Sequence, residues 1–185
     1  MRPFATALLL GAPLLLTACD TADTDGPPRR AVVTAVQVDD GPLLAANGEQ
    51  WDGTGGGGPE IYFRLLYADD ANTSAGVLNP VDDPFVVNVS NPDQPWYDDV
   101  RTADFPLVWD VDGGFEVRDF QETYRVVLVD SDPTTADDVM ISTRTFSFDE
   151  EAPARADGRE DTITLEGQGA DENRVQVRLR VVYED

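Results

Sequence analysis

The sequence predicts an all-β protein, a β-sandwich of about eight strands. Three observations favour this class. Apolar and polar residues alternate with a period of two in the clearest segments. No segment carries an apolar stripe at helical spacing. Proline and glycine interrupt the chain at roughly the spacing of turns between sandwich strands.

The first twenty residues have the features of a secretory leader. A positive start is followed by an apolar stretch from Phe4 to Leu16, which is shorter than the about 20 residues of a membrane-spanning helix. Cys19, the single cysteine, directly follows Leu-Thr-Ala. This motif resembles the bacterial lipobox, which implies cleavage before Cys19 and diacylglycerol on its thiol. We therefore expect Met1–Ala18 to be removed and the protein to be lipid-anchored in the cell envelope, outside the cytoplasm.

The rest of the chain is organised as a tether and one domain. Asp20–Arg30 is polar and contains a pair of prolines, so residues 19–30 are predicted to be the lipidated cysteine and a tether. The remaining length, residues 31–185, suits a single β-sandwich domain.

Three segments are the clearest strands. Asn173–Tyr183 alternates valine and leucine with arginine and glutamine, which predicts one buried and one solvated face. Glu60–Tyr67 alternates in the same way. Thr123–Val129 is almost continuously apolar, as expected for a strand in the centre of a sandwich. Weaker candidates are Ala31–Val38, Phe85–Val89, Leu107–Val111, Phe115–Arg118, Val139–Phe148 and Asp161–Glu166.

Composition excludes much of catalytic chemistry. The chain has no histidine and no lysine, and all 13 basic residues are arginine. It therefore has no histidine base for a serine nucleophile and no lysine for a Schiff base. With Cys19 consumed by lipid, no thiol remains for a disulfide or a zinc site. We expect a protein that is not an enzyme, whose carboxylate and hydroxyl oxygens suit hard cations such as calcium.

The charge balance is strongly acidic. A formal net charge of −23 disfavours nucleic-acid partners and docking onto anionic lipid headgroups. Excess acid with arginine but no lysine is typical of proteins from salt-loving organisms, where high ionic strength screens self-repulsion. Many acidic residues are therefore expected to be solvated surface without a role in a site.

Two predicted loops carry carboxylates next to strong strands. The first holds Asp52 and Glu60, and the second holds Asp130, Asp132 and Asp138. Residues i and i+2 of an extended segment point the same way, so Asp130 and Asp132 are expected to face one point. Asp138 is placed to return from across its loop.

These loops resemble those of the calcium-binding C2 domain of protein kinase C and synaptotagmin, an eight-stranded antiparallel sandwich. In that family the first loop runs from one aspartate through a glycine-containing turn to a second, and the third loop reads Asp-x-Asp, five residues, then Asp. The resemblance implies calcium as the cofactor, held by Asp52, Glu60, Asp130, Asp132 and Asp138. The chain departs from the family in having glutamate at position 60, a first loop two residues longer, and no obvious basic lipid-binding patch.

Several functions remain open at this point. The leading hypothesis is a non-enzymatic, lipid-anchored envelope protein whose sandwich binds calcium for structure or interaction. The alternative is a metal-free adhesion or scaffolding sandwich that binds protein or glycan, with the loop carboxylates as solvated charge. A hydrolase that uses two carboxylates is a third possibility. The anchoring membrane, inner or outer, and the partner are not identified by the sequence.

Overall fold

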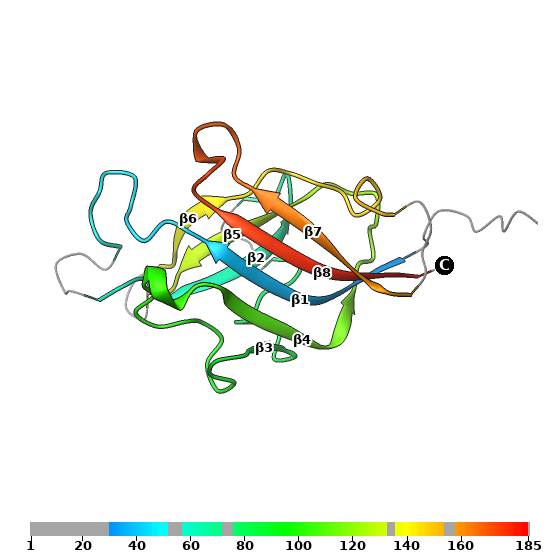
Figure 1. The fold of residues 1–185 in the computed structure, drawn as a ribbon, viewed down its shortest axis with the longest axis horizontal. Coiled ribbons are helices and arrows are strands. Elements are labelled where there is room, and N and C mark those ends of the chain that lie inside the picture. The colour runs from blue at the N-terminus through cyan, green and yellow to red at the C-terminus, as the bar shows by residue number, and fades with distance from the viewer. Residues whose placement is uncertain (1–29, 52–56, 72–75, 133–135, 154–157, 185) are drawn as a thin grey trace, which may run out of the picture.

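The computed structural model describes residues 30–51, 57–71, 76–132, 136–153 and 158–184. These residues form an antiparallel sandwich of eight strands in two sheets, so the predicted fold class is confirmed (Figure 1). The strands are β1 (Arg30–Asp40), β2 (Ile61–Tyr67), β3 (Val86–Asn88), β4 (Leu107–Glu116), β5 (Tyr124–Asp130), β6 (Asp138–Ser142), β7 (Glu160–Glu166) and β8 (Gln176–Glu184). Two short 3-10 helices are η2 (Thr102–Asp104) and η3 (Gly169–Asp171). Within the described ranges, no helix has the length and apolar character needed to cross a bilayer.

The larger sheet has five strands in the order β3-β4-β1-β8-β7. Val36 of β1 lies opposite Trp109 of β4 and Leu179 of β8, and all three are fully buried. This register explains why β1, in the middle of the sheet, is rich in valine: β-branched side chains fit a pleated surface that is packed on one face.

The outer face of the larger sheet carries ion pairs between strands, one from β8 to the adjacent β1 and one from β8 across β1 to β4. The Arg178 guanidinium lies 2.9 Å from the Asp39 carboxylate, and that of Arg180 lies 3.0 Å from the Asp110 carboxylate. The arginines that alternate with valine and leucine in β8 are therefore matched by acid from β1 and β4. Pairs this exposed contribute little individually, about 0–1 kcal/mol.

The smaller sheet has the order β2-β5-β6, so β5 is its central strand. Most of β5 is buried on both faces, as its continuous apolar sequence predicts. Phe63 of β2 pairs with Leu128 of β5, and both side chains belong to the hydrophobic core.

Aromatic side chains join the two sheets in the core. The Trp109 ring lies 5.3 Å from the Phe63 ring and 4.9 Å from that of Tyr97, in both cases edge to face. The indole N–H of Trp109 donates a hydrogen bond to the Pro95 carbonyl oxygen at 2.8 Å. Such aromatic pairs contribute about 0.5–1.5 kcal/mol each beyond their buried area. Trp109 is therefore a core residue and is not available to a carbohydrate or peptide.

Two strand predictions differ from the structure. Leu107–Val111 and Phe115–Arg118 belong largely to one strand, β4, whose pairing with β1 shifts register between Val33 and Ala35. Two glycines with positive φ, at positions 113 and 114, allow the chain to bulge there.

The segment Val139–Phe148 is predicted as one strand, but β6 ends at Ser142. Beyond that point the chain crosses towards the other sheet. The backbone N–H of Arg144 donates to the Glu166 carbonyl of β7 at 2.7 Å. The hydroxyl of Thr143 accepts the backbone N–H of Val126 at 3.0 Å, so a side chain replaces a ladder hydrogen bond at the crossing.

The sandwich has two distinct ends. At one end, here called the terminal end, β1 begins and β8 finishes, since Arg30 lies opposite Glu184 (Figure 1). At the other, here called the loop end, Asp40 lies opposite Gln176, and Ile61 begins β2 opposite Asp130. The loop end comprises the described residues of 41–60, 97–106, 131–137 and 167–175, which connect the strands there.

Candidate functional site

Four of the six predicted site residues lie in the described part of the chain, all at or next to the loop end. Glu60 directly precedes β2, Asp130 is the last residue of β5, and Asp138 is the first residue of β6. Ile61 and Asp138 both lie opposite Asp130 in the register. The three acidic positions are therefore at the ends of three neighbouring strands. The sequence predicts only that each acidic loop adjoins a strand. Cys19 and Asp52 lie outside the described residues.

Asp130 is a buried carboxylate with a structural role. Its side chain is 1% exposed, and one carboxylate oxygen accepts the backbone N–H of Glu60 at 2.9 Å. The Glu60 carbonyl in turn accepts the backbone N–H of Ser131 at 2.8 Å. These two bonds extend the β2–β5 ladder past its last regular pair and fix where both loops start.

The other carboxylates do not converge in the described structure. Asp138 is exposed and Asp132 is half-buried. Among the described residues, no three acidic side chains are grouped closely enough to hold a metal ion. The donor set fits calcium in its chemistry, because all candidate ligands are carboxylate oxygens. Backbone positions at the three strand ends are adjacent, but the described side chains form no closed cage.

A partly buried cluster of Tyr62, Arg64 and Asp137 ties the β5–β6 loop to β2. The Tyr62 hydroxyl donates to an Asp137 carboxylate oxygen at 2.5 Å, and the Arg64 guanidinium donates to the same oxygen at 2.8 Å and also to the Tyr62 hydroxyl. The guanidinium carbon of Arg64 lies 5.1 Å from the centre of the Tyr62 ring, a cation–π contact. Burial, and then the hydrogen bond to Asp137, raise the pKa of Tyr62 well above its usual value. The cluster anchors Asp137, the residue directly before Asp138. It therefore fixes the position at which β6 begins.

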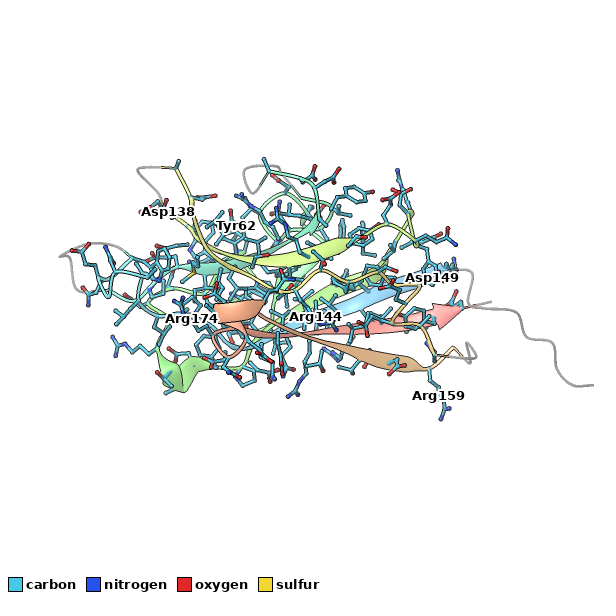
Figure 2. The ribbon with its side chains drawn as sticks, turned by 90° about the horizontal axis from the view of Figure 1, so that it is seen from above. Tyr62, Asp138, Arg144, Asp149, Arg159 and Arg174 are labelled. Atoms are coloured by element: carbon cyan, nitrogen blue, oxygen red, sulfur yellow. The ribbon has the colours of Figure 1, made fainter. Side chains whose placement is uncertain are left out.

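Sequence reasoning missed this cluster. Tyr62 and Arg64 are two residues apart on one face of β2, and Asp137 approaches from a loop 73 residues later than Arg64. The aspartate is one of many in an acidic chain, and no spacing rule connects it to β2. Figure 2 shows Tyr62 near Asp138 at this end of the molecule.

A second contact at the loop end joins the first acidic loop to the 97–106 loop. A carboxylate oxygen of Asp99 accepts the backbone N–H of Gly58 at 3.1 Å, and Asp99 has a φ of 49°. A Cβ at position 58 would lie 2.4 Å from the Val100 carbonyl oxygen, so only glycine permits this approach. In the sequence, the pair Asp98-Asp99 indicates only a general acidic bias. In the structure, Asp99 positions the end of the loop that contains Asp52.

Two shallow hollows adjoin this contact. One, of about 370 Å³, is lined by Ser90, Tyr97, Asp98, Asp99, Val100, Arg101 and Asp104. The other, of about 340 Å³, is lined by Leu43, Leu44, Gln50, Gly57, Gly58, Pro59, Val100, Arg101 and Thr102. Leu44 is 49% exposed, so the second hollow has an apolar rim, and Arg101 is its charged lining residue. Both are open depressions, and neither gathers the predicted calcium ligands.

Comparison with known proteins gives structural likeness only. No family model and no curated protein matches the chain in sequence. A C2 domain of plant extended synaptotagmin 1 aligns with 86% of this chain and 96% of its own at 14% identity and a TM-score of 0.46. Human GIVD cytosolic phospholipase A2 aligns with 84% of this chain at 12% identity and a TM-score of 0.44, and the chain spans only 17% of that protein. At such identities and TM-scores, both likenesses concern the fold and carry no information about function.

Proposed function

We propose that the protein is a non-enzymatic, lipid-anchored binding domain of the cell envelope. The lipobox-like sequence before Cys19 and the leader in front of it support the anchor. The absence of histidine and lysine from the sequence argues against nucleophilic and Schiff-base catalysis. The sandwich is a scaffold packed around one hydrophobic core, and loops at the end of such a scaffold are common positions for binding residues.

The finer proposal is that the loop end binds calcium. One observation carries it: the register brings Glu60, Asp130 and Asp138 to the ends of three adjacent strands. Asp132 follows Asp130 by two residues, and Asp52 belongs to the loop that ends at Glu60. Calcium takes six to eight oxygen ligands and offsets the mutual repulsion of carboxylates held together. In this proposal these five residues supply the protein oxygens.

A thermal melt tests calcium binding. A ligand that binds only the folded state stabilises it by RT ln(1 + [L]/Kd), which is about 2.7 kcal/mol at a hundredfold excess over Kd. We expect a higher melting temperature in calcium than in chelator, and a much smaller difference for the double variant Asp132→Asn/Asp138→Asn. A wild-type melt that is identical in calcium and in chelator would contradict the calcium proposal.

Metabolic labelling tests the anchor. Cells that express the full chain are grown with radioactive palmitate, and the wild-type protein is expected to carry the label and to sediment with membranes. The Cys19→Ser variant should lose both properties. An unlabelled wild-type protein would contradict the lipid anchor and leave the fold assignment unaffected.

A second candidate function is a metal-free adhesion or scaffolding domain. It is favoured by the two hollows with Leu44 at the rim of one and by the lack of a three-carboxylate group among the described residues. The same melt separates the two candidates. Under the metal-free hypothesis calcium leaves the melting temperature unchanged, and the Asp132→Asn/Asp138→Asn variant behaves as wild type under both conditions.

A further inference from the structure

The turn of residues 45–49, at the loop end, places an asparagine directly before a glycine. The backbone N–H of Gly48 donates to the Ala45 carbonyl oxygen at 2.8 Å, and that of Ala45 donates to the Glu49 carbonyl oxygen at 2.9 Å. Gly48 has a φ of 82°, a conformation that favours glycine. Asn47 and Gly48 are both exposed, and a Cβ at position 48 would meet no atom within 4 Å. Solvent therefore has access to the side-chain amide of Asn47 and to the backbone that follows it.

An Asn-Gly pair in solvent undergoes a hydrolytic reaction. The glycine nitrogen, after losing its proton to water or hydroxide, attacks the side-chain carbonyl carbon of the asparagine. The new N–C bond closes a five-membered imide, the bond to the side-chain nitrogen breaks, and ammonia leaves. Water then opens the imide at either carbonyl, which gives aspartate or isoaspartate, the form in which the backbone runs through the side chain. The reaction consumes water and releases ammonia, and no oxidant or reductant takes part.

The described asparagines differ in whether they can react in this way. Asn79 and Asn91 precede proline, whose backbone nitrogen carries no proton to lose. Asn88 is 2% exposed and precedes a β-branched valine, so both solvent access and the approach of the next nitrogen are obstructed. Two exposed asparagines remain, Asn47 and Asn173.

Asn173 offers a matched comparison for Asn47. It is also exposed in a turn, and the backbone N–H that follows it, of Arg174, donates to the Asp171 carbonyl oxygen at 2.9 Å. The attacking nitrogen is therefore restrained by a turn hydrogen bond at both sites. The sites differ in the residue that supplies this nitrogen: the Cβ and long side chain of arginine obstruct the attack, and glycine has neither.

We propose that Asn47 is a site of spontaneous deamidation, and that its conversion to aspartate and isoaspartate opens the 45–49 turn. The Asn47 amide donates to a Glu49 carboxylate oxygen at 2.8 Å, and its side-chain oxygen accepts the Glu49 backbone N–H at 3.0 Å. Deamidation replaces the amide donor by a carboxylate that is ionised at neutral pH and repels the Glu49 carboxylate. Isoaspartate also adds a methylene to the backbone, which displaces the Gly48 N–H from its acceptor.

The turn lies beside the second hollow of the loop end. Leu44 and Gln50 flank the turn, and both line that hollow. Deamidation of Asn47 therefore alters the rim of the hollow and adds a negative charge to it. The reaction requires neither the lipid anchor nor calcium, so the proposal is independent of both.

Peptide mapping of the folded protein tests the modification site. The purified chain is incubated in mildly alkaline buffer, and samples taken with time are digested with trypsin and analysed by mass spectrometry. Tryptic peptide 31–64 contains Asn47 as its only asparagine, and tryptic peptide 160–174 contains Asn173 as its only asparagine. A sample digested before incubation controls for deamidation during the digest.

We expect peptide 31–64 to gain about 1 Da with time, faster at higher pH, as an amide becomes a carboxyl group in two separable products. Peptide 160–174 should keep its mass over the same period. In the Asn47→Gln variant peptide 31–64 should also keep its mass, because the longer side chain would have to close a six-membered imide. An unchanged mass of peptide 31–64 in the wild type, or the same gain in the variant or in peptide 160–174, would overturn the assignment.

Amide hydrogen exchange tests whether the modification opens the turn. The Asn47→Asp variant supplies the added charge without the rerouted backbone, and incubated wild-type protein supplies both. We expect the backbone N–H groups of Ala45, Gly48 and Glu49 to exchange faster in the variant than in fresh wild type, and faster still in the incubated protein. Exchange that is as slow in the modified protein as in the fresh protein would contradict the opening of the turn.

Discussion

The Tyr62–Arg64–Asp137 cluster leads to a quantitative prediction for Asp137→Asn. The substitution keeps the size of the side chain and an oxygen that can accept a hydrogen bond, but it removes the negative charge. The guanidinium of Arg64 and the hydroxyl of Tyr62 then lose the charge-assisted part of their bonds at 2.8 and 2.5 Å.

The structure sets the size of the effect through burial. The side chains of Arg64 and Asp137 are 14% and 31% exposed, so solvent screens this pair less than a surface pair. A hydrogen bond to a charged group contributes about 1.5–3 kcal/mol and an exposed ion pair about 0–1 kcal/mol. We therefore expect Asp137→Asn to lower the free energy of unfolding by about 1–2 kcal/mol, a fall in melting temperature of about 3–6 °C.

The assay compares this variant with Asp110→Asn, a matched control in the same chain. Asp110 also pairs with an arginine, but the Arg180 and Asp110 side chains are 39% and 59% exposed. Asp110→Asn is expected to lower the free energy of unfolding by no more than about 0.5 kcal/mol. Molar salt should remove this difference but leave most of the difference caused by Asp137→Asn. If the two variants melt at the same temperature in calorimetric scans, burial does not strengthen the Arg64–Asp137 pair and the reasoning is refuted.

Three further predictions concern stability. Burial raises the pKa of Tyr62, Tyr124 and Tyr183 above the usual value of about 10, so their contribution to stability is complete below pH 10 and is lost as the pH rises further. In a titration followed by tyrosine absorbance they should ionise only as the protein unfolds, and ionisation at pH 10 in the folded state would contradict this. Asp130→Ala removes the acceptor for a backbone N–H and should cost about 1–3 kcal/mol in chelator as well as in calcium, by denaturant unfolding. A loss seen only in calcium would contradict the structural role of its hydrogen bond to the Glu60 backbone. Trp109→Ala leaves a cavity in the middle of the core and should lower the free energy of unfolding by about 3–5 kcal/mol. A decrease below about 1 kcal/mol would contradict a core position for the ring.

The strands could be predicted from sequence because each has a buried face that imposes a pattern. β8 alternates arginine with valine and leucine, and β5 is apolar throughout most of its length because both of its faces are covered. What the pattern could not indicate is where a strand changes partner. The run from Val139 to Phe148 is apolar enough for one strand, but the Thr143 hydroxyl and the Arg144 backbone bond to different sheets.

The positions of the candidate site residues along the chain could be predicted better than the burial and contacts of their side chains. The sequence placed the acidic loops at strand ends, and the register shows that Glu60, Asp130 and Asp138 lie at the ends of neighbouring strands. The burial of Asp130 and its bond to a backbone N–H depend on the packing of the two sheets, which residue spacing does not encode. The roles of Asp99 and Asp137 depend on contacts between loops far apart in sequence, and a chain with so many acidic residues offers no local signal for either.

A calorimetric titration with calcium tests the central claim most directly. The measurement uses the Cys19→Ser chain from residue 19 onward, at low and at molar salt, beside the Asp132→Asn/Asp138→Asn variant. We predict saturable binding that persists in molar salt for the wild-type loops, because salt screens a cation held among desolvated carboxylates less than one attracted to surface charge. The double variant should bind far more weakly. Heat that disappears in molar salt, or equal binding by both proteins, would show that the loop carboxylates are solvated surface charge.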